Sequence, residues 1–124
     1  MRGTVLLVDS DRSPLVDVDL FRANGLVVYQ YQEPGQALQQ FQELGADVIV
    51  VVSGHSRSIV SALRGLADYA TSIVVASTHE DREEARSAGA DSFLLNSARP
   101  SDLLYEIHRA LILRRSGRRL PWNW

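Results

Sequence analysis

Cysteine and lysine are both missing from this sequence of 124 residues. Without cysteine the chain cannot form disulfides, use a thiol nucleophile or bind metals through thiolates. It also lacks any run of about 18 apolar residues, so no membrane-spanning helix is expected. The first residues lack the cleavage pattern of a secretory signal. A cytoplasmic protein is therefore predicted, and because all 13 basic residues are arginine, no lysine ammonium can serve any site.

The composition that remains suits one compact domain, since 45% of the residues are hydrophobic and the net charge is only −2. This balance does not call for a nucleic-acid or membrane partner. We expect a folded domain over residues 1–113 and a basic tail or linker over 114–124. The tail could contact nucleic acid, although a solvated end is the simpler interpretation. It holds four arginines and both tryptophans: Arg114, Arg115, Arg118, Arg119, Trp122 and Trp124.

Five short apolar segments alternate with five amphipathic segments along the chain. Strands are predicted at 4–10, 26–31, 47–52, 72–78 and 91–95. Helices are predicted at 13–25, 36–44 and about 59–66, from a capping box at Thr78 and Asp81, and after Pro100. Strands joined by helices run parallel, and their right-handed crossovers produce a doubly wound sheet. We therefore predict an α/β fold of the (βα)5 type, with the flavodoxin-like strand order 2-1-3-4-5.

In such a sheet, ligands bind outside the carboxyl ends of the strands, near the point where the strand order reverses. The predicted strands place a mixed set of side chains there. The strand 47–52 is apolar at every position after Asp47 and presents only a valine at its end. The candidate site residues are Asp9, Ser10, Asp11, Val52, Ser77 and Asn96.

Four stretches of the sequence, "VLLVDSD", "ADVIVVV", "IVVAST" and "AGADSFLLNSARPSDL", resemble the signature stretches of response-regulator receiver domains, the CheY-like family of two-component signalling. The resemblance covers residues 3–113. It implies a CheY-like fold and a pocket in which an acidic pair binds Mg²⁺, an aspartate accepts a phosphoryl group, and a hydroxyl and a lysine contact the phosphoryl oxygens. Each part of this chemistry needs its own side chain.

Only some residues of this sequence match that pocket. By the resemblance, Asp9 matches the first metal-binding acid, whereas Ser10 replaces the second. Val52 occupies the phosphoacceptor position, where an isopropyl group can neither attack phosphorus nor bind a metal. Ser77 matches the switch hydroxyl, and Asn96 replaces the lysine. We therefore predict that the ordinary receiver reaction does not occur.

By the same resemblance, Phe93 matches the aromatic switch residue that pairs with Ser77 in receiver domains. We expect Phe93 to be a fixed core side chain in this chain. A lone carboxylate with hydroxyls makes a poor octahedral cage, so no Mg²⁺ site and no cofactor are expected. The chain is predicted not to be an enzyme. Its predicted role is that of an atypical receiver that binds proteins independently of phosphorylation.

The resemblance also implies where a partner would bind, on the face made by the fourth helix, fifth strand and fifth helix. Candidate partners are a histidine kinase, an output domain or a second copy of the chain. Charge on such a face is also common on ordinary solvated surfaces. The predicted contact residues are Arg82, Glu83, Arg86, Ser92, Tyr105, Glu106 and Arg109.

Two alternative functions remain open from the sequence. The first is a switch that responds to a ligand or to phosphorylation at Ser53 or Asp11. The second is a metal-binding protein, in which His55, His79 and Asp9 meet at the same edge of the sheet and act as ligands. Their spacing matches no known metal motif, and loop histidines are common.

Overall fold

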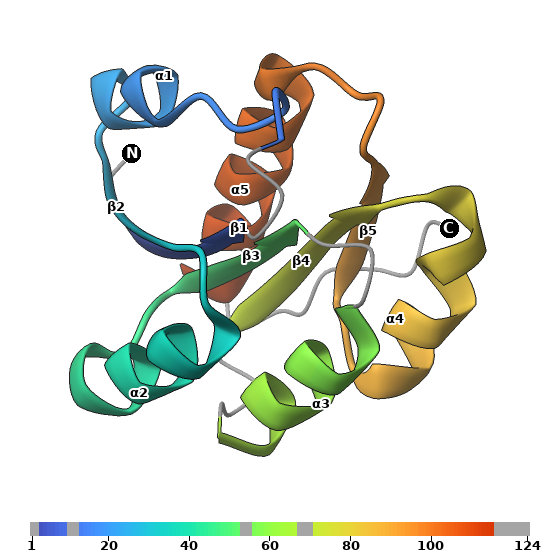
Figure 1. Ribbon diagram of the computed structural model, residues 1–124. Helices are drawn as coiled ribbons and strands as arrows, with labels where there is room; N and C mark the ends of the chain where they lie inside the picture. Colours follow the sequence, from blue (N-terminus) through green and yellow to red (C-terminus); the bar gives the residue numbers. More distant parts are fainter. Residues whose placement is uncertain (1–2, 10–12, 53–55, 67–70, 116–124) are drawn as a thin grey trace.

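The computed structural model describes residues 3–9, 13–52, 56–66 and 71–115. Strands and helices alternate along this part of the chain (Figure 1). The strands are β1 (Gly3–Asp9), β2 (Leu26–Tyr31), β3 (Val48–Val52), β4 (Ser72–Ser77) and β5 (Ser92–Leu95). The helices are α1 (Val18–Ala23), α2 (Pro34–Leu44), α3 (Ser56–Leu66), the short 3-10 turn η1 (His79–Asp81), α4 (Arg82–Ala88) and α5 (Pro100–Arg115).

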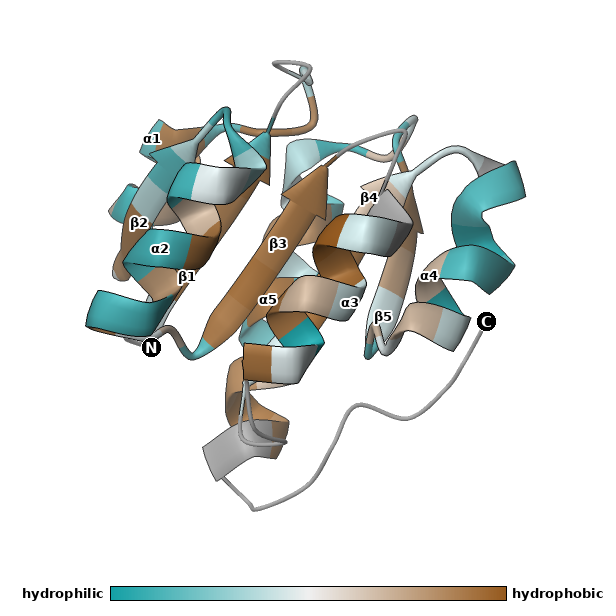
Figure 2. Ribbon diagram, turned by 60° about the horizontal axis from the view of Figure 1, so that its bottom comes forward, coloured by the Kyte–Doolittle hydropathy of each residue, from teal (hydrophilic) through white to brown (hydrophobic). Residues whose placement is uncertain are grey.

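The five strands form one parallel sheet in the order β2-β1-β3-β4-β5, which confirms the predicted doubly wound α/β fold. Side chains of α1 and α5 pack on one face of the sheet, and side chains of α2, α3 and α4 pack on the other. The central strand β3 is buried along its whole length and appears in Figure 2 as a continuously hydrophobic strand, as expected for a strand covered on both faces. Among the described residues, none of the helices has the length and apolar character needed to cross a membrane.

The prediction for the first helix was wrong at its start. The helix begins at Val18, not at residue 13, and its N-cap is Asp17, whose carboxylate accepts a hydrogen bond from the backbone N–H of Leu20. The hydroxyl of Ser13 instead accepts from the N–H of Leu15 at 3.2 Å and closes a turn. Leu15 is nevertheless buried in the core, as its apolar character suggested.

The start of the fourth helix also differs from its prediction. The spacing of Thr78 and Asp81 predicted a capping box, in which the Thr78 hydroxyl would accept from a backbone N–H. The structure has η1 at this position and begins α4 only at Arg82. The Thr78 hydroxyl donates to the Asp81 carboxylate instead, at 3.3 Å. At the far end of the chain, α5 continues through Arg115, whereas residues 116–124 of the predicted tail lie outside the described part.

Asp47 joins the beginnings of three strands. Its carboxylate accepts from the N–H of Thr4 at 2.9 Å, and its own N–H donates to the carbonyl of Thr4 at 2.9 Å. Its carbonyl accepts from the N–H of Ser72 at 3.2 Å. One residue thereby connects β1, β3 and β4 at the amino-terminal edge of the sheet, opposite the candidate site.

Arg64 connects α3 to the segment that leads into β5. Its guanidinium pairs with the buried carboxylate of Asp91 and donates to the carbonyls of Gly89 and Thr71 at 3.0 and 3.2 Å. The Asp91 carboxylate also accepts from the N–H of Ile73 at 2.9 Å. These bonds satisfy a largely buried ion pair, which would otherwise be costly to desolvate.

Candidate functional site at the carboxyl edge of the sheet

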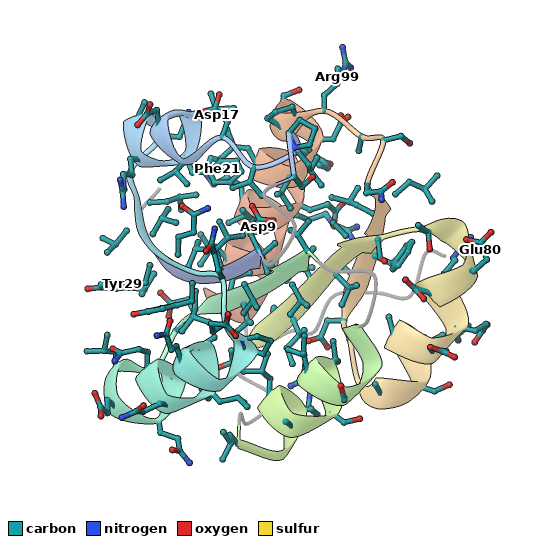
Figure 3. All side chains as sticks on the ribbon, viewed as in Figure 1. Asp9, Asp17, Phe21, Tyr29, Glu80 and Arg99 are labelled. Atoms are coloured by element: carbon teal, nitrogen blue, oxygen red, sulfur yellow. The ribbon has the colours of Figure 1, made fainter. Side chains whose placement is uncertain are left out.

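Asp9 and Val52 end the neighbouring strands β1 and β3 and are partners in the strand register. Asp9 is 2% exposed and lies inside the molecule (Figure 3). Its carboxylate accepts from the N–H of Ser13 at 3.1 Å, so it helps to fix the loop that follows β1. Val52 is 3% exposed and belongs to the hydrophobic cluster shared with α1 and α5. The structure therefore brings together a carboxylate and an alkyl side chain at this edge.

Ser77 ends β4 and is 2% exposed. Its hydroxyl donates to the carboxylate of Asp81 at 2.5 Å, four residues further along the chain. Val74 and Ala76 pack in the cluster with α1 and α5, so alternation along β4 turns Ser77 toward the opposite face, where α3 and α4 lie. The same alternation places Asp9 on the α1 and α5 side, with Leu7. The predicted hydroxyl and the predicted carboxylate thus belong to opposite faces of the sheet.

Asn96 and Phe93 lie at or near the end of β5. The backbone N–H of Asn96 donates to the carbonyl of Ser77 at 2.9 Å, and the residue is exposed. Phe93 is partly buried against the cluster formed with α2, α3 and α4. Phe93 is therefore half-buried against this cluster, and the fixed position expected for its ring stays a prediction.

Several predicted site residues lie outside the described part of the chain. These are Ser10, Asp11, Ser53 and His55, and the side chain of His79 is likewise not described. Within the described residues, no group of three or more histidine, aspartate or glutamate side chains could hold a metal ion. The metal-binding and alternative phosphorylation hypotheses depend on residues beyond this part, so both stay predictions.

The predicted interaction face contains a connected polar network. The hydroxyl of Ser92 on β5 donates to the carboxylate of Glu106 on α5 at 2.9 Å, and Arg109 lies 3.5 Å from the same carboxylate oxygen. Tyr105 is 67% exposed on α5. On α4, whose ribbon is largely hydrophilic in Figure 2, Arg86 and Glu83 form a pair at 3.9 Å. Arg82, at the start of this helix, is partly buried.

Sequence reasoning missed the residue that holds Ser77. Asp81 was assigned only to helix capping, although its spacing of four residues from Ser77 was visible in the sequence. Sequence reasoning also gave no role to Asp47 or to the pairing of Arg64 with Asp91. Those contacts join segments 25–43 residues apart in the chain, so no local pattern reveals them.

The arrangement described above is the fold of response-regulator receiver domains, the CheY-like α/β fold. A receiver domain protein from Methanospirillum hungatei JF-1 is similar to this chain with a TM-score of 0.78 and 18% identity, covering 94% of this chain and 99% of that one. The chemotaxis response regulator CheY4 of Vibrio cholerae has a TM-score of 0.75 and 25% identity, covering 90% of this chain and all of that one. A receiver domain protein from Clostridium thermocellum has a TM-score of 0.77 and 17% identity, covering 93% of this chain and 98% of that one.

These structural similarities establish the CheY-like α/β fold of the chain. No protein-family model matches the sequence, and a comparison with curated proteins found no match. At these identities, the similarity carries the architecture but not the chemistry of the pocket, which has to be argued from the residues themselves.

Proposed function

We propose that this chain is an atypical receiver domain that transmits signals by binding another protein, without phosphorylation of an aspartate at the end of β3. The observation that carries this proposal is Val52, which is 3% exposed and packed in the core beside Asp9. The cytoplasmic location predicted from the sequence belongs to the same proposal. So do the predicted absences of an enzymatic activity and of a cofactor.

The side chains at the edge support this interpretation chemically. A phosphoryl acceptor must offer an oxygen, nitrogen or sulfur nucleophile, and the side chain of Val52 has none. Charge that develops on a transferring phosphoryl group needs a cation. Asn96 at the end of β5 is neutral, and the chain has no lysine to replace it.

The hydrogen bond from Ser77 to Asp81 supports the same proposal. A hydroxyl that would turn toward a bound phosphoryl group already donates to a carboxylate of its own chain at 2.5 Å. An incoming anion would have to displace that carboxylate and would also meet its negative charge. Ser77 and the start of α4 are therefore held in one arrangement by the protein itself.

We propose that the partner binds the face formed by α4, β5 and α5, and is a histidine kinase, an output domain or a second copy. Tyr105 provides a large exposed aromatic ring at this face, and aromatic side chains often dominate binding energy. Glu106 and Arg109 are held by the network with Ser92, so their charges are already positioned before binding.

Treatment with acetyl phosphate and Mg²⁺ tests phosphorylation independence. Intact-mass measurement should show no added phosphoryl group, and beryllofluoride with Mg²⁺ should leave the backbone amide NMR spectrum unchanged. A receiver domain that is readily phosphorylated serves as the control for the reagents. A phosphoryl adduct on any aspartate of this chain would contradict the proposal.

Sedimentation of paired tyrosine variants tests the interaction face, with a second copy as the probe. Tyr105→Ala should weaken self-association about tenfold, as expected for an aromatic anchor. Tyr29→Ala, on β2 at the opposite edge of the sheet, should leave it unchanged and is the matched control. If both variants weaken association equally, or if the wild type stays monomeric, the second copy is not the partner.

A further inference from the structure

Exposed apolar side chains collect at the amino-terminal edge of the sheet, away from the candidate site. Seven large hydrophobic residues of the described part are exposed, and four of them lie at this edge. Leu44 and Leu66 are the last residues of α2 and α3, and they are 54% and 44% exposed. Ile112, in the last turn of α5, and Val27, the second residue of β2, are each 50% exposed. Leu44 and Leu66 belong to helices on the same face of the sheet, and an apolar patch at one end of a fold is a candidate contact surface.

The described part of the chain finishes at this same edge. The last turn of α5 lies against the start of the sheet, because a Cβ atom at Gly3 would come within 2.6 Å of the Leu111 side chain. Gly3 is in turn the register partner of Leu26, the first residue of β2. The nine residues that follow Arg115 in the sequence therefore begin beside the exposed apolar side chains.

The sequence of these nine residues, "SGRRLPWNW", has a pattern suited to covering such a surface. Leu120, Trp122 and Trp124 alternate with other residues, and Pro121 favours an extended backbone at the residue before it. An extended segment with this spacing presents its apolar side chains on one side. Nine extended residues span up to about 30 Å, which is enough to pass beneath a five-stranded sheet whose strands are about 4.8 Å apart.

One carboxylate lies beside the proposed docking surface, next to Leu44. Arg118 and Arg119 precede the apolar residues of the segment, whereas residues 23–56 of the domain contain no arginine. The acidic residues of that region include Glu43, which is exposed directly before Leu44. An arginine pair therefore has a carboxylate next to the apolar contact.

From these observations we propose that residues 116–124 dock in cis on the amino-terminal edge of their own domain, with Trp122 and Trp124 covering Leu44 and Leu66. This docking site is separate from the face proposed for the partner. It would leave the α4, β5 and α5 face free while removing the side chains of Leu44 and Leu66 from water. The proposal does not depend on the signalling role and can fail without affecting it.

Tryptophan fluorescence of the full chain tests the proposal directly, since the chain has only two tryptophans and both lie in the segment. The native protein should emit to the blue of the same protein in urea and should be less accessible to acrylamide. Leu44→Arg and Leu66→Arg should each lower the docking equilibrium constant about tenfold, because each removes a leucine contact. Leu95→Arg is the matched control, since Leu95 is 45% exposed at the other end of the sheet, and it should leave the emission unchanged.

Three results would overturn the docking proposal. The first is a native emission equal to that in urea. The second is an equal effect of Leu95→Arg and the two test variants, or no effect of either test variant. The third is a blue shift that grows with protein concentration, which would assign the segment to a second copy. Far-ultraviolet circular dichroism checks that all three exposed-site variants remain folded.

Discussion

The bond between Ser77 and Asp81 joins the end of β4 to the last residue of η1, which is also the N-cap of α4, through two side chains. Because Ser77 is buried, its hydroxyl has little access to water if the carboxylate is removed. A buried donor without an acceptor costs about 1–3 kcal/mol, more than the loss of an exposed hydrogen bond. The contribution of this bond to stability is therefore measurable.

A double-mutant cycle isolates the contribution of this bond. Asp81→Ala should lower the free energy of unfolding by about 1–3 kcal/mol in urea titrations at pH 7. Ser77→Ala should lower the free energy of unfolding by less, because it removes the buried hydroxyl itself and leaves no donor without an acceptor. The coupling energy between the two changes should be about 1–2 kcal/mol, and additive effects would contradict the assignment. Thr78→Ala, which removes a longer and exposed bond to the same carboxylate, is the control and should change stability by less than about 0.5 kcal/mol.

The positions of Asp9 and Val52 were predictable from the sequence, because each residue ends an apolar strand. The sequence did not predict which side chains meet. Alternation along β1 and β4 assigns Asp9 and Ser77 to different faces of the sheet, and their sharing of one pocket at the carboxyl edge stays a prediction. The partner of Ser77 depends on the geometry of η1, which no sequence pattern indicated.

Helix α4 and the turn that follows it depend on one glycine. Gly89 has φ of +112°, and a Cβ atom there would lie 2.9 Å from Cγ of Arg64, the residue that connects α3 to Asp91. A side chain at this position would be strained by its backbone conformation and would also displace Arg64. The connection between α3, α4 and β5 therefore requires glycine.

Two glycine substitutions, which we expect to change the stability of the protein in opposite directions, test this requirement. Gly89→Ala should destabilise the protein by about 1–2 kcal/mol from the backbone strain, with a further cost from the contact with Arg64. Gly35→Ala, in α2, meets no atom within 4 Å and should stabilise the protein by about 0.5 kcal/mol, because alanine favours the helix. Thermal unfolding of both variants gives the comparison. A neutral Gly89→Ala would show that the Arg64 connection can rearrange freely.

The elements themselves were predicted with differing success for physical reasons. β2 was predicted with both bounds correct, because its apolar run is enclosed by Gly25 and the segment before Pro34. The start of α1 was wrong because Ser13 and Asp17 are both good capping residues. Asp17 accepts the Leu20 N–H, while Ser13 closes its own turn.

For the whole molecule, the strand order predicts how stability is distributed. β1, β3 and β4 each pair on both sides, whereas β2 and β5 pair on one side only. Amides of the three inner strands should exchange slowest with deuterium, close to the rate set by global unfolding, and those of β2 should exchange faster. Hydrogen exchange followed by NMR checks this order. Equal protection of β2 and β3 would contradict it and would indicate that another chain covers the β2 edge.

The bonds of Asp47 carry a consequence for the opposite edge of the sheet. They connect β1, β3 and β4 near the starts of these strands, about 17 Å along the chain from Val52. A shift of β3 by one residue would exchange the faces of all its side chains and bring a different residue beside Asp9. The chemical character of the carboxyl edge is thus determined in part by a carboxylate at the other end of the strand, which no ligand at that edge would touch.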